Sequence, residues 1–372
     1  MRVLIDSRMI YMSGIGRYIR NILSHMHRMD ENLYFDLRGN PHEFQRFLNE
    51  SQVNAQQFSH TPYHPVIYSL REQLEGSAQM LASCSDVFHI PHFNAPRCLP
   101  TSTVVTVHDL IPFKFPDLYN PLRIRAARQV LKNAVKKAAR IIVVSDATAY
   151  DLLDMFPAQS IEQKIRRTYL GVSERFHRLD QAEVKHFKCQ NNLGEYVLFV
   201  GNRLPHKNLG RLARAMSLLQ SDFPGLQLVV AGNRLREHDE LDQARRSVEC
   251  GPITEWGPAN DEELIALYNG ARALAFPSLC EGFGLPALEA MACGTPAVVS
   301  NTGSLPEVAG EAGIYVDPYD VHDIARGIRQ VLIDHKLRNH RVLIGLEQAA
   351  RFRWEDTARQ TIDIYREVAG KC

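Results

Sequence analysis

Short apolar runs rich in β-branched residues alternate along this chain with amphipathic stretches, and this alternation limits the possible folds more than any other feature. Several of the runs are apolar throughout, as in strands that are covered on both faces. Strands that alternate with helices form parallel sheets built from right-handed βαβ units. The runs predict strands at 3–6, 34–37, 87–90, 103–107, 141–145, 196–201, 226–231, 253–256, 273–276, 297–300 and 313–316. The amphipathic stretches predict helices at 17–28, 122–140, 208–220, 236–248, 261–270, 285–293, 321–334, 336–350 and 354–369.

The alternation restarts after a polar, weakly patterned stretch at 173–194, and 372 residues exceed what one hydrophobic core usually supports. We therefore expect an α/β protein with two doubly wound, Rossmann-like domains that face a central cleft. The predicted domains are 1–172 and 173–353, with a last helical segment, 354–372, that packs back on the first domain. Ligands of such sheets bind outside the carboxyl ends of the strands.

Composition excludes several other classes of protein. The chain is 45% hydrophobic and 23% charged, and no apolar run approaches the roughly 20 residues of a membrane span. The N-terminal apolar stretch is too short for a signal peptide, and none of the seven cysteines forms a C-x-x-C pair. We expect a cytoplasmic protein without structural zinc or a disulfide framework.

The positive charge is uneven. Residues 1–172 hold 20 Lys and Arg against 15 Asp and Glu, although the whole chain has a net charge of only +1. The predicted helix 122–140 has seven basic residues and no acid, and four of the basic residues share one face: Arg125, Arg128, Lys132 and Lys136. This face is either a solvated flank or a contact for anionic lipid head groups or a lipid-diphosphate-linked acceptor. No signature of nucleic-acid binding accompanies it.

The densest motif is Phe-Pro-Ser-Leu-Cys-Glu-Gly-Phe-Gly-Leu-Pro-Ala-Leu-Glu, residues 276–289. A strand ends, a glycine loop follows, and a helix begins near Leu285. The free N–H groups of that helix end form a seat for an anion. Gly282 and Gly284 let the backbone approach a ligand, and Glu281 and Glu289 can accept hydrogen bonds from sugar hydroxyls.

A second strand-to-helix motif is Val-Gly-Asn-Arg-Leu-Pro-His-Lys-Asn-Leu, residues 200–209. Arg203 can grip phosphate in a bidentate fork, and Lys207 adds a point charge near the helix start. Solvated surface charges are the alternative for each residue taken alone.

Two motifs in the first half complete the set. His108 lies beside Asp109 at the carboxyl end of the strand 103–107, a position that favours a functional role over a structural one. The Gly14-Ile-Gly16 loop follows the first strand, but Ile19 replaces the third glycine of a dinucleotide fingerprint. Dinucleotide chemistry is therefore disfavoured, and contact with an anion or a sugar remains open.

In this order the four motifs resemble glycosyltransferase family 4, whose members are retaining enzymes of the two-domain GT-B architecture. The E-x₇-E pair within Glu-Gly-Phe-Gly-Leu-Pro is the most specific element. The segments 69–74 (Ser-Leu-Arg-Glu-Gln-Leu) and 88–94 (Phe-His-Ile-Pro-His-Phe-Asn) further resemble mannosyl- and rhamnosyltransferases of bacterial surface polysaccharides. The resemblance covers nearly the whole chain.

The resemblance implies a role for each motif. Arg203 and Lys207 would neutralise the leaving diphosphate of a nucleotide-sugar, and Glu289 would hold the ribose. Glu281 would contact the donor sugar, and His108 would lie beside it. The backbone of the glycine loops would position sugar and phosphate, through Phe283, Gly284 and Leu285 in one domain and Gly14 and Gly16 in the other.

The chain is accordingly expected to move a hexose, mannose or a related deoxyhexose from a GDP-sugar, to a saccharide acceptor that is lipid-linked. No cofactor is expected, and the absence of a D-x-D triplet predicts no metal. A UDP- or dTDP-sugar donor, a nucleotide-sugar epimerase and a non-catalytic sugar-nucleotide-binding protein are the alternatives. Peripheral contact with the inner face of the cytoplasmic membrane is a further expectation.

Overall fold

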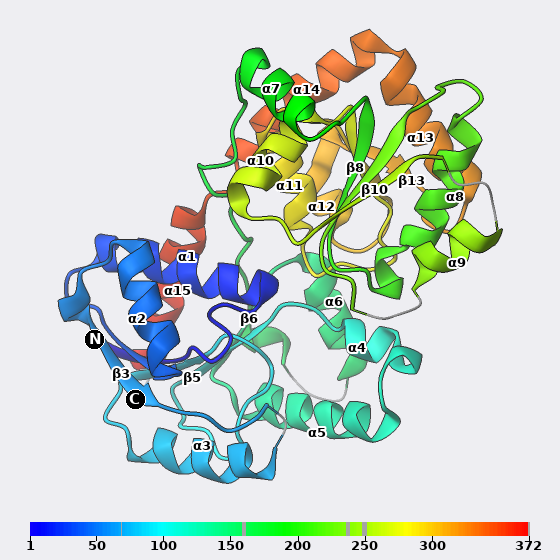
Figure 1. Cartoon of the computed structure of the whole chain (residues 1–372). Coiled ribbons are helices and arrows are strands. Elements are labelled where there is room, and N and C mark those ends of the chain that lie inside the picture. Colours follow the sequence, from blue (N-terminus) through cyan, green and yellow to red (C-terminus); the bar gives the residue numbers. More distant parts are fainter. Residues whose placement is uncertain (68, 158–160, 236–238, 248–250, 371–372) are drawn as a thin grey trace. The chain divides into compact units, whose positions relative to one another are not determined.

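The computed structural model describes residues 1–67, 69–157, 161–235, 239–247 and 251–370. The chain forms two compact units (Figure 1). The first unit holds Met1–Gly171 together with Arg353–Cys372, and the second holds Val172–Phe352. The strand pairs found in the described residues are all parallel, as the alternation of strands and helices predicts.

The first unit contains a seven-stranded sheet of order β3-β2-β1-β4-β5-β6-β7. Its strands are β1 (Arg2–Asp6), β2 (Tyr34–Gly39), β3 (Phe58–Pro62), β4 (Val87–Ile90), β5 (Thr103–Val107), β6 (Arg140–Val143) and β7 (Ile165–Arg167). Its helices are α1 (Ser13–Met29), α2 (Pro41–Ser51), α3 (Leu70–Ala82), α4 (Ile111–Lys114), α5 (Pro121–Lys137), α6 (Asp146–Met155) and α15 (Trp354–Ala369). Three short 3-10 turns also belong to it: Ala55–Gln57, Pro116–Leu118 and Glu162–Lys164.

The second unit contains a six-stranded sheet of order β10-β9-β8-β11-β12-β13. Its strands are β8 (Tyr196–Val200), β9 (Gln227–Ala231), β10 (Ile253–Gly257), β11 (Ala273–Phe276), β12 (Ala297–Ser300) and β13 (Ile314–Val316). Its helices are α7 (Gln181–Gln190), α8 (Leu209–Leu219), α9 (Glu240–Ser247), α10 (Asp261–Gly270), α11 (Leu285–Ala292), α12 (Leu305–Ala309), α13 (Val321–Ile333) and α14 (His335–Ala350). Two 3-10 turns lie at Pro205–Lys207 and Gly310–Ala312.

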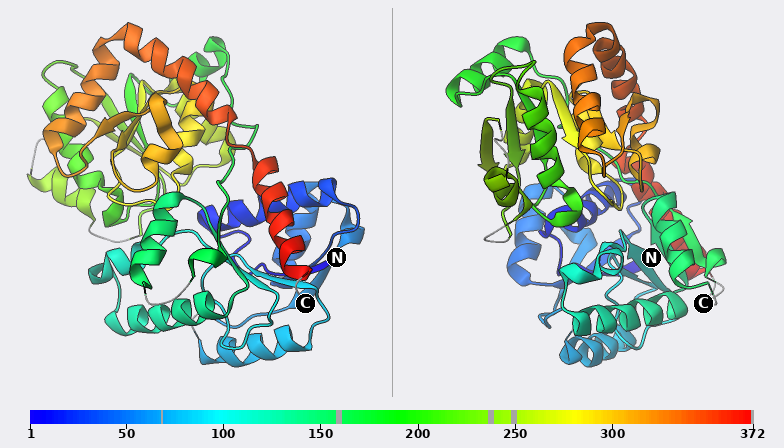
Figure 2. Two further views of the ribbon diagram at one scale, coloured as in Figure 1. Left: turned by 180° about the vertical axis from the view of Figure 1, so that it is seen from behind. Right: turned by 90° about the vertical axis from the view of Figure 1, so that its right-hand side faces the viewer.

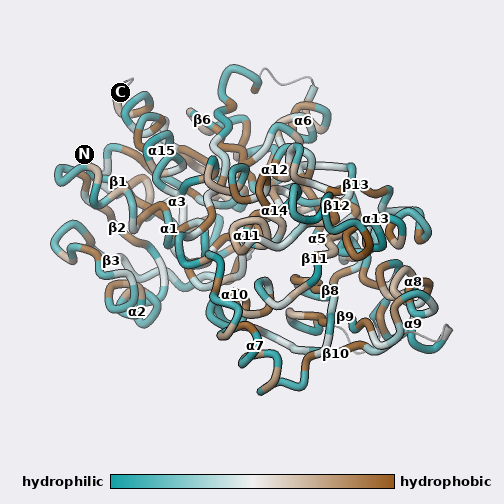
Figure 3. The backbone as a smooth tube through the Cα atoms, turned by 90° about the horizontal axis from the view of Figure 1, so that it is seen from above, coloured by the Kyte–Doolittle hydropathy of each residue, from teal (hydrophilic) through white to brown (hydrophobic). Residues whose placement is uncertain are grey.

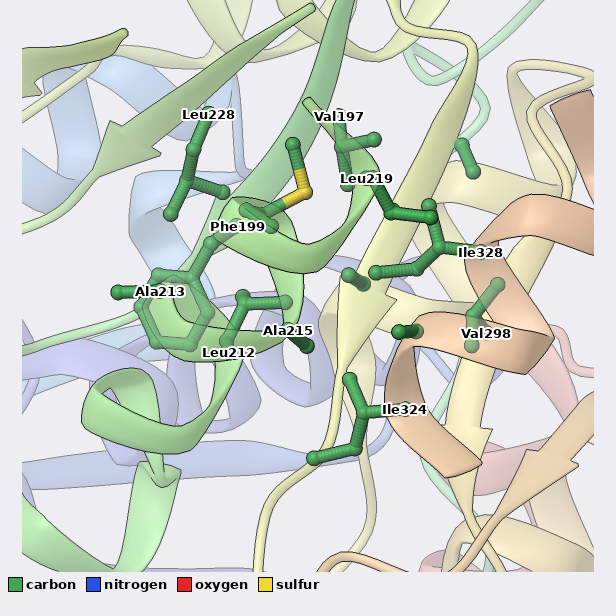
Figure 4. Packing of buried hydrophobic residues seen from close by; sticks show 14 of the residues in the cluster. Val197, Phe199, Leu212, Ala213, Ala215, Leu219, Leu228, Val298, Ile324 and Ile328 are labelled. Carbon is green, nitrogen blue, oxygen red and sulfur yellow. The ribbon is translucent and has the colours of Figure 1, made fainter. Parts of the chain in front are cut away.

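Close packing of aliphatic side chains holds the second unit together. Helix α8 packs against α9 and α13. Between the helices and the sheet lies a buried cluster that includes Phe199 of β8, Leu212 of α8 and Ile328 of α13 (Figure 4). Helix α11 packs against α14. Glu289 is the one charged residue in the sequence of α11, and Figure 3 accordingly colours this helix largely in brown shades. This packing fixes the loops that follow the strands.

The C-terminal helix completes the core of the first unit. Helix α15 packs against α1, and Figure 2 shows the two lying side by side. Trp354, Ile362 and Tyr365 of α15 are buried. The Tyr365 hydroxyl is 2.6 Å from Nδ1 of His89, a buried residue of β4. The last helix is thus tied to the sheet by a polar contact as well as by apolar packing.

The structure differs from the predicted elements at several places. The polar stretch 173–194 contains a helix, α7, and the basic helix α5 ends at Lys137, so that Arg140 lies in β6. The predictions omitted β3, β7, α2, α3 and α6. The prediction of a helix at 236–248 falls partly outside the described residues, because 236–238 and 248 are not described.

Candidate functional site

The two predicted donor motifs lie at the point where the strand order of the second sheet reverses. Strands β8 and β11 are neighbours, although β9 and β10 lie between them in the sequence. In doubly wound sheets, ligands bind at this switch point, outside the carboxyl ends of the strands. The Leu279 backbone N–H donates to the His206 carbonyl at 2.7 Å. That bond ties the loop after β11 to the loop after β8.

Lys207 and Glu281 meet at this switch point. The ammonium Nζ of Lys207 lies 2.7 Å from Oε1 and 2.9 Å from Oε2 of Glu281. Both side chains are largely buried, and the Lys207 ammonium lies 5.1 Å from the centre of the Phe276 ring. Two residues predicted from separate motifs are therefore brought together in one charged pair.

Two helices begin beside this pair, and the N-terminus of α11 is open. Neither α8 nor α11 has a side-chain cap from its N-cap residue or an acidic residue in its first turn, but in α8 the Gly210 backbone N–H donates to Oε2 of Glu240 at 3.4 Å. Among the described helices of eight residues or more with a described N-cap, only α1 in the first unit shares both properties. By contrast, α10 has a complete capping box and three acids in its first turn. Uncapped N–H groups and a positive dipole end favour an anion.

Glycine is required at the start of α11. Gly284 is the N-cap and has a φ of 113°, and a Cβ there would lie 2.6 Å from Cδ2 of Leu305. Ser304 holds the preceding loop, since its hydroxyl donates to the carbonyls of Phe283 at 2.7 Å and Glu281 at 3.1 Å. Gly282 is not among the glycines with positive φ, and close approach of the Gly282 and Gly284 backbone to a ligand stays a prediction.

Arg203 lies in an ion-pair network. Its guanidinium contacts Asp239 through Nε at 2.5 Å and Glu255 through Nη1 at 2.5 Å, and its side chain is only 3% exposed. Asp242 lies 3.7 Å away, at the edge of ion-pair range. Diphosphate binding by Arg203 stays a prediction. It would require the guanidinium to leave the carboxylates of Asp239 and Glu255 and to bind phosphate oxygens in their place. The sequence gives no signal for these partners, which lie 36 to 52 residues further along the chain.

Glu289 lies inside α11 and is buried, with 3% of its surface exposed. The hydroxyl of Tyr268, from α10, donates to its Oε2 at 2.9 Å. Tyr268 is a residue that sequence reasoning missed. Among the predicted backbone contacts, Phe283 is buried against Phe352, with the ring centres 5.8 Å apart, and Leu285 is the first residue of α11.

In the first unit, His108 follows β5 and is 8% exposed. Its Nε2 lies 2.9 Å from the Pro91 carbonyl oxygen, so this nitrogen carries the proton and Nδ1 keeps its lone pair. The ring packs edge-on against Tyr18, 5.0 Å away. Burial lowers the pKa of His108 to about 4, so the imidazole is neutral near pH 7.

The two glycines of the first loop differ in their surroundings. A Cβ on Gly16 would lie 2.6 Å from the Ile10 carbonyl oxygen and 2.8 Å from that of Met9, so packing alone requires glycine there. A Cβ on Gly14 would meet nothing within 4 Å. Gly14 therefore has the open side that a ligand contact needs, beside the uncapped end of α1.

A buried charged cluster lies at the switch point of the first sheet, between β1 and β4. Arg8 pairs with Asp6 at 2.7 Å and with Glu72 at 2.6 Å, and Glu72 accepts a hydrogen bond from Asn94 at 2.6 Å. Asp6, Arg8, Asn94 and His92 line a small pocket there. Glu72 belongs to the sequence motif 69–74, and His92 and Asn94 belong to the motif 88–94, but spacing alone does not show that they meet with Asp6 and Arg8.

The basic residues of α5 lie on the surface as predicted. Arg125, Arg128, Lys132 and Lys136 are exposed, and no ion pair of theirs is found in the described part of the chain. Over the same residues, no group of three or more His, Cys, Asp or Glu is arranged to hold a metal ion. None of the described helices is both long enough and apolar enough to cross a bilayer.

The fold and the site define a glycosyltransferase of the GT-B class. A structure of Anabaena HepE in complex with UDP and glucose aligns with 99% of this chain and 100% of its own, with a TM-score of 0.77 and 16% identity. The family model "Glycosyl transferases group 1" matches residues 182–343, and "Glycosyltransferase Family 4" matches residues 12–176.

Two relatives from Escherichia coli are similar in sequence. The O-antigen chain mannosyltransferase B is 37% identical over 289 residues, which are 75% of this chain and 74% of the relative. The serotype-specific mannosyltransferase WbdA is 31% identical over 276 residues, 71% of this chain but only 33% of that longer protein. The chain belongs to glycosyltransferase family 4, which confirms the resemblance and the fold predicted from the sequence.

Proposed function

We propose that this glycosyltransferase moves mannose, or a related deoxyhexose, from a GDP-sugar to a saccharide acceptor with retention of anomeric configuration. Two relatives whose names state mannosyl transfer support the choice of sugar. The observation that carries the proposal is the Lys207–Glu281 pair, which lies beside the start of α8 and the uncapped N-terminus of α11. The site combines a cation and helix ends for phosphate with a carboxylate for sugar hydroxyls.

The donor would bind at the switch point of the second sheet. Lys207 and the first turns of α8 and α11 would stabilise the negative charge that develops on the departing diphosphate. Glu281 would accept hydrogen bonds from the donor sugar, and Glu289 from the ribose. Arg203 would join the diphosphate only after leaving Asp239 and Glu255.

The first unit would hold the acceptor, beside His108 and Gly14. In the proposed reaction the bond from the anomeric carbon to the phosphate oxygen breaks, and the acceptor oxygen bonds to that carbon on the same face. The acceptor proton passes to the departing phosphate. The state between them has positive charge on the sugar, as in other glycosyl transfers. No covalent enzyme–sugar adduct forms.

The acceptor is proposed to be a lipid-linked saccharide of a bacterial surface polysaccharide. Arg125, Arg128, Lys132 and Lys136 would then contact anionic membrane lipid at the inner face of the cytoplasmic membrane. The electrostatic attraction of exposed basic residues to anionic lipid supports this part of the proposal.

A donor panel tests the proposal. Slow hydrolysis and binding are measured with GDP-mannose, GDP-fucose, UDP-glucose and dTDP-rhamnose, and the anomeric configuration of the product is determined by NMR. Preferential turnover of a GDP-hexose with retention supports the proposal. Preference for a UDP- or dTDP-sugar would overturn the choice of donor, and an epimerised nucleotide-sugar without transfer would overturn the reaction.

A further inference from the structure

The outward face of helix α3 is apolar. Leu70, Leu74 and Leu81 are 84%, 75% and 62% exposed, and Ala78 between them is exposed as well. Their spacing of four and seven residues places them on one side of the helix. Solvent-facing helix sides normally carry polar residues, and a contiguous apolar face marks an interaction site.

The charged residues of α3 do not offset this face. Arg71 and Glu75 pair with each other, with Nε and Oε2 2.7 Å apart, and so add no net charge. Glu72 is fully buried in the ion pair with Arg8. The exposed leucines are therefore the main feature that α3 presents to its surroundings.

Helices α3 and α5 are neighbours that both contact the segment 96–98. The Cys98 backbone N–H donates to the Ser77 hydroxyl of α3 at 3.0 Å. From α5, Asn133 and Lys137 donate to the Arg97 carbonyl oxygen at 3.1 and 2.7 Å. Figure 1 and the left view of Figure 2 show α3 and α5 as neighbours along the same edge of the first unit, with an end of one near an end of the other.

Helix α5 supplies positive charge next to the leucines. It carries six basic residues and no acid, and Arg97 between the helices is exposed too. Leu122, at the start of α5, is 78% exposed. We define the α3–α5 surface by eleven exposed residues of the two helices: Leu70, Leu74, Ala78, Leu81, Leu122, Arg123, Arg125, Arg128, Lys132, Lys136 and Lys137.

We propose that the α3–α5 surface docks on an anionic bilayer, with the leucines of α3 inserted at the boundary of the acyl chains and the cations of α5 at the head groups. Exposed leucines beside Lys and Arg side chains that form no ion pair with any residue the structure describes match the two layers of such a membrane, apolar within and anionic at its surface. A second copy of the chain fits less well, because two such surfaces would repel each other through α5. The inference deepens the proposed function by naming the inserted element.

Vesicle binding of the full chain tests the surface without donor or acceptor. Co-sedimentation is measured with vesicles of phosphatidylcholine alone and of phosphatidylcholine with phosphatidylglycerol in equal parts. The wild type is expected to bind the anionic vesicles. Arg128→Gln with Lys132→Gln should lower partitioning about thirtyfold, because each basic residue near an anionic surface contributes roughly fivefold. Leu70→Ser with Leu74→Ser should lower it about tenfold or more.

Matched variants control for composition. Leu343→Ser on α14 removes a leucine that is 60% exposed, and Lys185→Gln removes an exposed lysine of α7; both should bind as the wild type does. Thermal unfolding checks that every variant is folded. Wild-type binding by both α3–α5 variants, or no binding of the wild type at low salt, would overturn the inference. A change of oligomeric state in the leucine variant, with vesicle binding intact, would overturn it in favour of a protein contact.

The vesicle-binding test can be separated from the test of the proposed function by measuring turnover of an acceptor that needs no membrane. Turnover of a water-soluble, lipid-free acceptor should be unchanged in both α3–α5 variants. Lost vesicle binding with turnover intact supports the surface, whereas absence of transfer by the wild type refutes the proposed function and leaves vesicle binding to be judged by itself.

Discussion

Replacing Lys207 by Met tests the central feature of the donor site. Met keeps much of the apolar stem and removes the ammonium that lies 2.7 Å from Glu281. At an effective dielectric constant of about 20, two unit charges at that separation attract by about 6 kcal/mol. A diphosphate, with at least two charges, would compete successfully with Glu281 for the same ammonium. Without that ammonium, the developing phosphate charge loses its nearest cation.

The expected loss is about 2–4 kcal/mol of transition-state stabilisation, which corresponds to a decrease in kcat/KM of roughly 30- to 1000-fold. Lys207→Met also leaves the largely buried carboxylate of Glu281 unpaired, so the free energy of unfolding should fall by about 3 kcal/mol. The double variant Lys207→Met with Glu281→Gln removes both charges. It should regain stability without regaining the rate.

The assay is the initial rate with a GDP-sugar, run beside urea unfolding of each variant. Lys188→Met is a matched control, because Lys188 also pairs with a glutamate at 2.6 Å, but that glutamate, Glu195, is 58% exposed whereas Glu281 is 8% exposed. That control should change kcat/KM by less than about twofold, since exposed pairs contribute little. Full activity of folded Lys207→Met would refute the assignment of the diphosphate to Lys207. Recovery of the rate in the double variant would show that unpaired Glu281, not the missing cation, caused the loss.

Three further predictions concern stability, pH and metal. Arg203→Met should lower the free energy of unfolding by about 3–5 kcal/mol in urea titrations, because Asp239 and Glu255 lose their buried partner; unchanged stability would contradict the network. Burial lowers the pKa of His108 to about 4, against an ordinary 6.5, so the unfolded state binds more protons between those values and stability falls as the pH falls from 6.5 to 4. His108→Asn should flatten that decline between pH 7 and pH 5, and an unchanged slope would argue against a neutral, buried ring. Dialysis against EDTA should leave the turnover rate intact, and a complete loss that Mg²⁺ restores would establish a metal requirement.

The fold was predictable where strands are buried along their whole length, whereas both edge strands of the first sheet were missed. The predicted bounds of β4, β5, β11 and β12 match the structure. The edge strands β3 and β7 read Phe-Ser-His-Thr-Pro and Ile-Arg-Arg, with polar residues and a proline that an edge tolerates and a central strand does not. Helix α3 escaped detection because its leucines face outward, so its pattern does not resemble that of a helix with one buried apolar side.

The site was predictable to the extent that its residues occupy strand ends. Lys207 and Glu281 follow adjacent strands, and topology alone brings such residues together. The environment of Arg203 depends on where α9 begins and how β10 is aligned with β9, and neither is encoded near Arg203 itself. The Tyr268–Glu289 hydrogen bond and the Arg8–Glu72 ion pair likewise join segments that are distant in the sequence, so local patterns do not predict them. Local patterns name the reactive side chains but not the partners that neutralise them.

The return of α15 to the first unit has a consequence for biosynthesis. A ribosome releases residues 1–171 and then the entire second unit before the codons for Trp354, Ile362 and Tyr365 are translated. Until α15 is synthesised, the first unit is incomplete: the face of α1 that packs against α15 is uncovered, and His89 lacks its contact with Tyr365. The second unit can already be compact at that stage. Nascent chains stalled just short of α15 should be the form most exposed to chaperones and proteases. The first unit, although it is translated first, would therefore complete its folding last.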